Sequence, residues 1–195
     1  MIIGVLALQG NFAMHQIMLS KLDAPSILVK YPHELEKCDG LIIPGGESST
    51  MSKLIDSHGF RVPISDYAKT NPIFGTCAGM ILLSSSEVTK NLTPLRIMDF
   101  TVARNAWGRQ IFSFTKEVDI YLTEKVKYLA TFIRAPKIKT ISDSINILSK
   151  LNKEIILITD GMHLASSFHP EFGVDTQIHD YFIQIVRTNE KINSL

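Results

Sequence analysis

The first half of the chain alternates short apolar runs with segments whose apolar residues recur at helical spacing. Four runs have the length and composition of strands covered on both faces, at residues 2–7, 26–29, 41–43 and 73–74. Four segments have helical spacing, at residues 11–22, 48–55, 62–69 and 80–83. Because such segments follow one another with short connections, the pattern predicts a parallel sheet wound by right-handed crossovers.

Polar residues and glycines mark the ends of the expected helices. Asn11 is expected to cap the first helix, and Ile17 belongs to its predicted apolar face. Ser48 or Ser49 is expected to cap the second helix, and Gly59 to terminate it. These signals support separate, short helices between the strands.

From about residue 100 the pattern changes to short strands separated by Gly, Pro, Asn or charged turns. The expected strands lie at residues 100–102, 111–114, 128–133, 138–141, 145–148, 155–158 and 164–168. A final amphipathic helix is expected at residues 176–188. The second half therefore predicts an antiparallel layer attached to the parallel core, within one α/β domain that spans residues 1–195.

Composition and charge argue against several classes of partner. The 195 residues carry a formal net charge of +1 without a basic block, which gives no electrostatic reason to expect nucleic acid or an anionic membrane. No apolar run approaches the roughly 20 residues of a membrane helix. The apolar start, residues 1–8, is interpreted as a buried strand and not as a signal peptide. We therefore expect a cytoplasmic protein.

The two cysteines, Cys38 and Cys77, offer no disulfide framework. No CxxC or HxxxH spacing indicates a metal site, so neither a metal nor a cofactor is expected. Cys38 is interpreted as a half-buried packing residue. A reducing cytoplasm keeps Cys77 as a free thiol.

Cys77 lies in Gly75-Thr-Cys-Ala-Gly79, between an expected strand and an expected helix. A cysteine between glycines at such a corner has the form of a nucleophile elbow, and the helix N-terminus favours a thiolate. The alternative is a small buried cysteine at a tight turn. Downstream, His169 and Glu171 supply the imidazole and carboxylate of a triad, provided that the fold brings them to Cys77. Residues two apart in an extended segment point to the same side, so Glu171 is placed to orient His169.

The segment Pro44-Gly-Gly-Glu-Ser-Ser-Thr50 follows the third expected strand. Its glycine turn points backbone N–H groups into one place, as an anion site requires. A phosphate site is one interpretation, although the loop lacks the P-loop lysine and the GxGxxG pattern. We favour an oxyanion hole formed by the N–H groups of Gly46 and Ala78. A plain turn is the remaining alternative.

Arginines and histidines outside these segments give weaker signals. The segment Arg104-Asn-Ala-Trp-Gly-Arg-Gln110 concentrates arginines and amides, and Arg134 lies at an expected strand end. An arginine binds a carboxylate through paired hydrogen bonds, but a polar loop and a solvated strand end are the alternatives. The remaining histidines are interpreted as surface or core residues: His15, His33, His58, His163 and His179.

Six segments, in this order, resemble the class I glutamine amidotransferases and, more narrowly, the glutaminase subunits of pyridoxal 5′-phosphate synthase. They are Gly4-Val-Leu-Ala-Leu-Gln-Gly10, Pro44-Gly-Gly-Glu-Ser-Ser-Thr50, Gly75-Thr-Cys-Ala-Gly-Met80, Arg104-Asn-x-x-Gly-Arg-Gln110, Phe132-Ile-Arg-Ala-Pro136 and Ser167-Phe-His-Pro-Glu171. The elbow and the His-Pro-Glu segment occur across the superfamily. The first, fourth and fifth segments narrow the resemblance to vitamin B6 synthesis.

This resemblance implies a flavodoxin-like three-layer fold, with helices on both faces of a mostly parallel central sheet. It implies a triad of Cys77, His169 and Glu171 that hydrolyses L-glutamine to glutamate and ammonia through a glutamyl thioester. It implies glutamine contacts from Gly46, Glu47, Ser48, Arg104, Ile133 and Arg134. It also implies that the ammonia passes to a synthase (lyase) subunit in a large hetero-oligomer, where pyridoxal 5′-phosphate is built.

Three positions depart from the family's usual residues. They are Met14, Trp107 and Phe172, where glutamate, phenylalanine and leucine are usual. We expect these changes to affect partner docking and local packing but not the triad.

Two other functions stay open from the sequence. One is a cysteine peptidase of the same fold superfamily, which cleaves peptides and leaves glutamine untouched. The other is a binding subunit without turnover. The presence of Cys77, His169 and Glu171 argues against the second.

Overall fold

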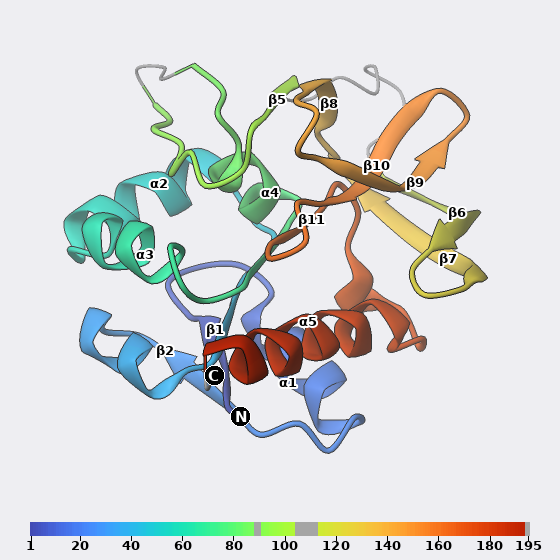
Figure 1. The fold of residues 1–195 in the computed structure, drawn as a ribbon. Coiled ribbons are helices and arrows are strands. Elements are labelled where there is room, and N and C mark those ends of the chain that lie inside the picture. The colour runs from blue at the N-terminus through green and yellow to red at the C-terminus, as the bar shows by residue number, and fades with distance from the viewer. Residues whose placement is uncertain (88–90, 104–112, 194–195) are drawn as a thin grey trace.

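Nine strands of the described chain form one sheet (Figure 1). The computed structural model describes residues 1–87, 91–103 and 113–193. Five of the nine strands are parallel and lie in the order β2-β1-β3-β4-β11. They are β1 (Ile3–Leu6), β2 (Ser26–Val29), β3 (Gly40–Ile43), β4 (Ile73–Thr76) and β11 (Leu164–Ser166). The first four are the apolar runs of the sequence, so the predicted parallel core is confirmed.

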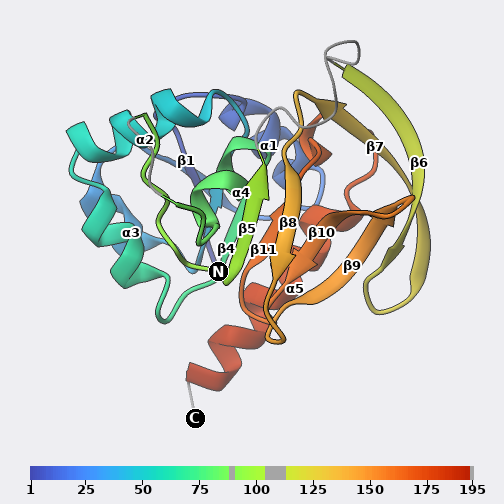
Figure 2. The same cartoon turned by 90° about the horizontal axis from the view of Figure 1, so that it is seen from above.

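Antiparallel strands continue this sheet beyond β11, in the order β10-β9-β6-β7. They are β6 (Ser113–Tyr121), β7 (Lys125–Ile133), β9 (Asn146–Leu151) and β10 (Glu154–Thr159). A separate ribbon pairs β5 (Phe100–Ala103) with β8 (Lys137–Ile141). Figure 2 shows the β6–β7 hairpin at one edge of the molecule. The expected antiparallel addition is confirmed, and most of it extends the parallel sheet edge to edge.

Strand β6 is longer than the sequence pattern indicated. The prediction covered residues 111–114, of which 111 and 112 lie outside the described residues, whereas the strand runs on to Tyr121. Charged residues such as Lys116 and Asp119 interrupt its apolar positions, so the sequence pattern did not predict that the strand continues beyond residue 114. Pairing with β7 supports the strand along its whole length, from Ser113 to Tyr121. The partner strand therefore determines the length of β6 more than its own sequence does.

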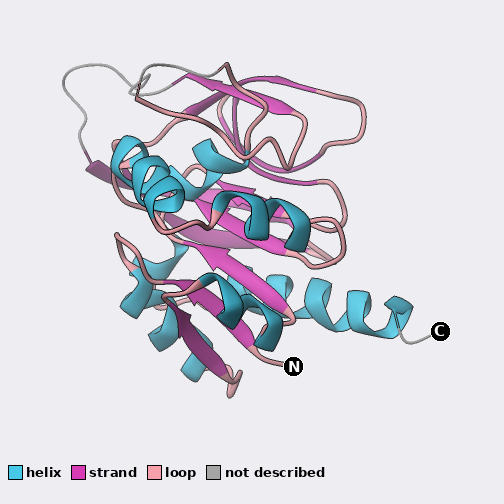
Figure 3. Ribbon diagram, turned by 90° about the vertical axis from the view of Figure 1, so that its left-hand side faces the viewer, coloured by secondary structure: helices cyan, strands magenta, loops and turns pink. Residues whose placement is uncertain are grey.

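Helices cover both faces of the sheet, as predicted for a three-layer fold (Figures 1 and 3). Helices α1 (Phe12–Ser20) and α5 (Gln177–Asn193) lie together on one face. The other face carries α2 (Ser48–Ser57), α3 (Arg61–Tyr67) and α4 (Ala78–Leu83). Two short 3₁₀ helices, η1 (Pro32–Lys37) and η2 (Pro170–Phe172), were not predicted. None of the helices in the described ranges is both long and apolar enough to cross a membrane.

Each face of the sheet has its own hydrophobic core. Leu41 and Ile43 of β3 pack with residues of α2, α3 and α4, whereas Ile42 between them packs with residues of α1 and α5. Alternate residues of a strand point to opposite faces, so one apolar run supplies both cores. This double burial explains why the parallel strands are continuously apolar and not alternating.

The buried face of α1 differs from the prediction. Ile17 was assigned to the apolar face but is 46% exposed, and the buried residues are His15, Met18 and Leu19. Asn11 does occupy the N-cap position, although its side chain makes no capping hydrogen bond. The helix therefore turns a polar residue, His15, into the interior.

The cap of α2 is also a correction. Ser48 and Ser49 lie inside the helix, and the cap is Glu47, whose carboxylate accepts hydrogen bonds from the backbone N–H groups of Ser49 (3.0 Å) and Thr50 (2.7 Å). A carboxylate suits this position because the helix N-terminus is electropositive. The predicted terminator is confirmed, since Gly59 follows the helix with φ of 71°.

Candidate active site

The candidate site lies at the carboxyl ends of three neighbouring parallel strands. The loop with Gly45 follows β3, Cys77 follows β4, and His169 lies shortly after β11. Neighbouring parallel strands end at the same edge of the sheet, so these segments meet although they are far apart in the sequence. The topology thus brings Cys77 and His169 together, as the sequence analysis required.

Cys77 occupies a sharp turn between β4 and α4. Its φ of 47° and ψ of −98° are rare for a residue with a side chain, and its backbone N–H donates to the Ser166 carbonyl at 2.8 Å. A Cβ added at Gly79 would lie 2.0 Å from the carbonyl oxygen of Ile43. Only glycine permits this close crossing of α4 over β3, so Gly79, two residues after Cys77, maintains the turn. The predicted nucleophile-elbow geometry is present.

His169 and Glu171 are hydrogen-bonded through their side chains. The distance from His169 Nδ1 to Glu171 Oε1 is 2.7 Å, and both side chains are buried. The expectation of an extended segment was wrong, because Glu171 lies in the 3₁₀ turn η2. The backbone N–H of His169 donates to the Thr131 carbonyl at 2.8 Å, which ties this turn to β7. The carboxylate therefore holds the Nδ1 side of the imidazole.

Charge at His169 and Glu171 is set by their contacts. Burial lowers the pKa of His169, but hydrogen bonds with Cys77 and Glu171 and the charges of both raise it to about 10. Burial raises the pKa of Glu171, but the imidazoles of His15 and His169 outweigh it, so this pKa is lowered. A protonated imidazole beside a thiol stabilises the thiolate. The arrangement therefore suits a cysteine nucleophile.

Gly45 lets the reacting groups approach one another. A Cβ added there would lie 2.5 Å from Cε1 of His169 and 3.3 Å from Cβ of Cys77. Contacts that short exclude any side chain at this position unless His169 moves. The Cys77 thiol also lies 3.7 Å from the carbonyl oxygen of Ile133. The loop after β3 and the end of β7 thus enclose the Cys77–His169 pair.

A cavity of about 710 Å³ opens beside Cys77. Its described lining consists of Gln9, Asn11, Gly46, Glu47, Ser48, Cys77, Ile81, Ser113, Ile133, Arg134, His169 and Phe172. Five of the six residues expected to contact glutamine are among them; the sixth, Arg104, lies outside the described residues. Ala78 is buried as the first residue of α4, directly after Cys77. The side chains in the described ranges contain no cluster of three His, Cys, Asp or Glu residues placed to hold a metal ion.

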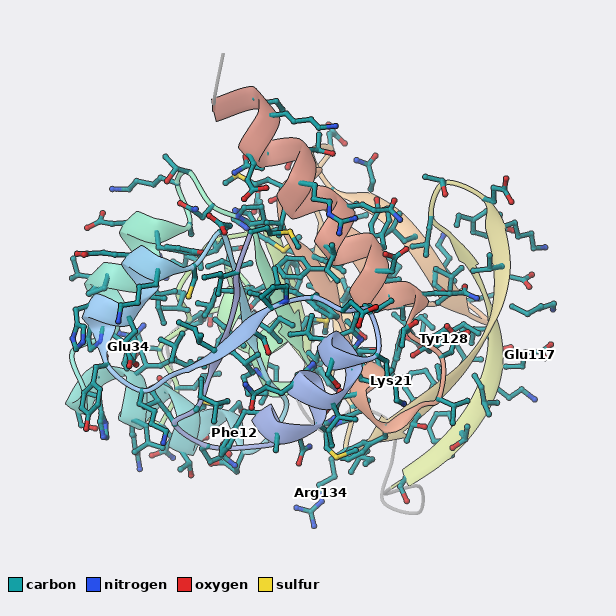
Figure 4. The ribbon with its side chains drawn as sticks, turned by 90° about the horizontal axis from the view of Figure 1, so that it is seen from below. Phe12, Lys21, Glu34, Glu117, Tyr128 and Arg134 are labelled. Carbon is teal, nitrogen blue, oxygen red and sulfur yellow. The ribbon has the colours of Figure 1, made fainter. Side chains whose placement is uncertain are left out.

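Glu47 and Arg134 bring opposite charges to this cavity. The pKa of Glu47 is lowered to about 2, because hydrogen bonds from Thr50 and Ser49 outweigh its partial burial. Arg134 follows β7 with φ of 46°, and Figure 4 shows its side chain extending outward from the ribbon. A cavity with an anionic and a cationic lining residue suits a zwitterion such as an amino acid.

Gln9 was not singled out by the sequence analysis. Its side-chain oxygen accepts a hydrogen bond from the backbone N–H of Glu47 at 3.2 Å. A Cβ at Gly46 would lie 2.6 Å from the same oxygen, so Gln9 packs directly on the loop after β3. Its place in the Gly4–Gly10 segment could have indicated a role in the site, but that segment was used only for the family resemblance and suggested no chemistry by itself.

Phe172 is a second residue that the sequence analysis misjudged. It was expected to leave the triad untouched, yet its ring centroid lies 5.4 Å from that of His169, and the side chain is 40% exposed. The turn η2 causes this contact, since it folds Phe172 back over the imidazole. Met14 lies on α1, and Trp107 lies outside the described residues.

Two histidines interpreted as surface or core residues are buried behind Glu171, one of them in contact with it and the other in contact with the first. His15 and His179 are fully buried, and Nε2 of His15 lies 3.6 Å from Oε2 of Glu171. His15 belongs to α1 and His179 to α5, so only the packing of these helices brings them together.

Sequence comparison identifies relatives that match nearly the whole chain. Residues 5–188 match the SNO glutamine amidotransferase family. A protein of Desulforamulus reducens named pyridoxal 5′-phosphate synthase subunit PdxT is 43% identical over 188 residues, covering 96% of this chain and 100% of that protein. A protein of the same name from Dehalococcoides mccartyi is 45% identical over 191 residues, covering 95% and 97%.

Solved structures share the fold. A crystal structure of a glutamine amidotransferase matches with a TM-score of 0.88 and 35% identity, covering 94% of this chain and 98% of that one. A glutamine amidotransferase from Thermotoga maritima matches with a TM-score of 0.58 at 13% identity, covering 100% and 85%. The second likeness concerns the fold alone.

Proposed function

Because the chain belongs to the SNO glutamine amidotransferase family, we propose that it hydrolyses L-glutamine and supplies the ammonia to a pyridoxal 5′-phosphate synthase subunit. The observation that carries this proposal is the meeting of Cys77, His169 and Glu171 beside a cavity of about 710 Å³. Residues 1–195 act as a single glutaminase domain.

The reaction proceeds through a covalent intermediate on Cys77. The Cys77 thiolate attacks the side-chain carboxamide carbon of glutamine, and the N–H groups of Gly46 and Ala78 stabilise the oxyanion. His169 gives its proton to the leaving nitrogen, so ammonia departs and a glutamyl thioester remains. His169 then takes a proton from water, whose oxygen attacks the thioester and releases glutamate and the thiolate. Glu171 keeps the imidazole oriented in both steps.

Residues of the cavity hold the amino-acid end of glutamine. Glu47 stays ionised at neutral pH and suits the α-ammonium group. Arg134, with Arg104, suits the α-carboxylate. Gly46, Ser48 and Ile133 complete the contacts through their backbones and short side chains. Because both charged groups sit on the α-carbon, binding them leaves the side-chain carboxamide directed toward Cys77.

The names of the relatives support the partner. Both relatives described above are named as subunits of pyridoxal 5′-phosphate synthase, which supports use of the ammonia by a synthase (lyase) subunit. We propose in addition that the two subunits assemble in a large hetero-oligomer. We place the complex in the cytoplasm, where reducing conditions keep Cys77 as a thiol. The reaction requires no nucleic acid, membrane, metal or cofactor on this chain.

The test combines the purified chain with its synthase subunit. We expect glutamine-dependent ammonia release and pyridoxal 5′-phosphate formation, both lost in Cys77→Ala. Ammonium salt should restore pyridoxal 5′-phosphate formation with Cys77→Ala, because the synthase then needs no glutaminase. Ammonia release that persists in Cys77→Ala, or cleavage of peptides with glutamine untouched, would overturn the proposal.

A further inference from the structure

A pair of buried histidines lies behind the proposed triad. His15 on α1 and His179 on α5 are both fully buried, and their Nδ1 and Nε2 atoms are 2.9 Å apart. Figures 1 and 4 show α1 and α5 side by side on one face of the sheet. Buried polar groups normally have hydrogen-bond partners. Since Nδ1 of His15 is paired with His179, the neighbours of its other ring nitrogen, Nε2, show what else this pair interacts with.

That nitrogen faces the triad carboxylate. Nε2 of His15 lies 3.6 Å from Oε2 of Glu171 and 3.4 Å from the hydroxyl of Thr76. The other carboxylate oxygen, Oε1, accepts from His169 at 2.7 Å. Within the described part of the chain, Oε2 has no hydrogen-bond partner at ordinary distance. His15 and His169 therefore flank Glu171, with one imidazole at each oxygen.

The contacts determine where the protons lie. An ionised carboxylate only accepts hydrogen bonds, so a proton on Nε2 of His15 is the arrangement that stabilises Oε2 at 3.6 Å, and Nδ1 is then an acceptor. The Thr76 hydroxyl, 3.4 Å from the same nitrogen, can donate or accept and is compatible with this tautomer. Nε2 of His179 must then donate to that Nδ1, which leaves Nδ1 of His179 unprotonated. In agreement, Nδ1 of His179 has no hydrogen-bond partner among the described residues. One charge, on Glu171, thus fixes the tautomer of both histidines.

Both histidines are neutral in this arrangement. Burial lowers the pKa of His15, although the charge of Glu171 opposes this shift, and burial lowers the pKa of His179 well below its usual range. Neutral donors stabilise the carboxylate without competing with His169 for its charge. His169 forms the ion pair with Glu171, and the neutral His15 stabilises the same carboxylate through the dipole of its N–H group.

We propose that His15 is a positioning residue that holds Oε2 of Glu171 through its neutral Nε2–H, while Nε2 of His179 donates a hydrogen bond to Nδ1 of His15. This proposal rests on the proposed function, because Glu171 matters for turnover only if His169 acts on Cys77. A carboxylate held at one oxygen can rotate, whereas one held at both keeps the imidazole aimed at Cys77. Neither histidine lines the cavity, so both act through Glu171.

The kinetic test compares His15→Leu with His15→Gln in the complex with the synthase subunit. Leucine fills similar space without a donor, and glutamine places an N–H near the position of Nε2. We expect His15→Leu to lower kcat on the order of tenfold to hundredfold with KM unchanged, as for other groups that orient a functional imidazole. His15→Gln should recover most of the loss. Leu19→Val, at a buried position of the same helix, is the control for packing and should retain kcat.

Two results would overturn the proposal: equal loss in His15→Leu and His15→Gln, or full kcat in both. A second measurement decides the matter even if His15→Leu fails to fold. Long-range ¹H–¹⁵N correlation spectra of the wild-type chain should show His15 and His179 neutral and protonated at Nε2 near pH 7. A proton on Nδ1 of His15, or a doubly protonated His15, contradicts the proposal. Because these spectra need no turnover, they judge His15 even if wild-type ammonia release is absent and the proposed function fails.

Discussion

At the residue scale, close contacts around Cys77 and His169 hold the reacting groups in place. Cys77 keeps a backbone conformation that costs about 1–3 kcal/mol, and the hydrogen bond from its N–H to Ser166 helps to maintain it. Gly45 packs against the imidazole of His169 with no room for a side chain. Small displacements at these positions should therefore affect chemistry more than folding.

Gly45→Ala tests this contact. The added methyl group would lie 2.5 Å from Cε1 of His169, so the imidazole must move away from Cys77. We expect glutamine hydrolysis in the complex to fall about 100-fold, since displacements of about 1 Å have effects of this size. Circular dichroism should show an unchanged fold.

Gly173→Ala is the matched control, because its added methyl group would meet its nearest neighbour at an ordinary 3.5 Å. It should keep wild-type turnover. Full turnover in Gly45→Ala would mean that glutamine hydrolysis does not require the imidazole of His169 to lie where it does beside Gly45 and Cys77.

Sequence reasoning identified reactive residue types more readily than their neighbours. Cys77, His169 and Glu171 carry distinctive chemistry in short motifs, so the sequence alone was enough to propose them as a triad, which stays a prediction. The contact of Phe172 with His169 was misjudged because it comes from the turn η2, and the contact of the core residue His15 with Glu171 was not anticipated because it comes from the packing of α1 and α5. No local spacing encodes such contacts.

At the scale of elements, one residue at the start of α2 both stabilises the helix and lines the candidate site. Glu47 caps the helix with both carboxylate oxygens, at 3.0 Å from the Ser49 nitrogen and 2.7 Å from the Thr50 nitrogen, while it also lines the cavity. The sequence suggested serine caps because Ser and Thr are frequent there. The carboxylate prevails because it satisfies two N–H groups at an electropositive helix end.

Glu47→Ala should lower the free energy of unfolding by about 1 kcal/mol, as loss of an N-cap commonly does. Urea unfolding of the isolated chain measures this, with Lys53→Ala at an exposed position of the same helix as control. The pKa of Glu47 is lowered to about 2, so the cap is fully present above about pH 4.5 and is lost as the pH falls toward 2. Equal free energies of unfolding for Glu47→Ala and Lys53→Ala would show that the Glu47 cap does not stabilise the chain.

At the scale of the whole molecule, the order of strands explains both the fold and the site. Apolar runs and helical spacing predicted the parallel core, because strands buried on both faces need continuous apolar residues. The pairing of β11 with β4 was not predictable from those patterns, since nearly ninety residues separate them in the sequence. Because Cys77 follows β4 and His169 lies shortly after β11, that pairing brings the two residues together.

Buried neutral histidines should make the stability of the molecule depend on pH. Burial lowers the pKa of His15, His163 and His179, so the unfolded chain binds protons below about pH 6.5 that the folded chain does not. Stability should therefore fall as the pH drops below about 6.5, by up to about 1.4 kcal/mol per pH unit for each neutral histidine. The raised pKa of His169 acts in another range: its contribution is complete below about pH 6.5 and is lost as the pH rises toward 10.

Urea unfolding from pH 7.5 to 5 measures this slope. His163→Asn keeps an acceptor for the backbone N–H of Ile73, which Nδ1 of His163 now accepts at 3.1 Å, and should flatten the slope. His33→Gln, at an exposed position, should leave the slope unchanged. A slope that does not respond to His163→Asn would contradict the assignment of buried neutral histidines.

The central claim is that Cys77 is the nucleophile for glutamine, and modification by a diazo ketone analogue of glutamine tests it most directly. Cys38 is an internal control, because burial and nearby carboxylates raise its pKa to about 11. At neutral pH, with the synthase subunit present, peptide mass spectrometry should find one modification, on Cys77, in proportion to the loss of ammonia release. His169→Asn should suppress it. Modification of Cys38 instead, or ammonia release that continues after Cys77 is fully modified, would contradict the account.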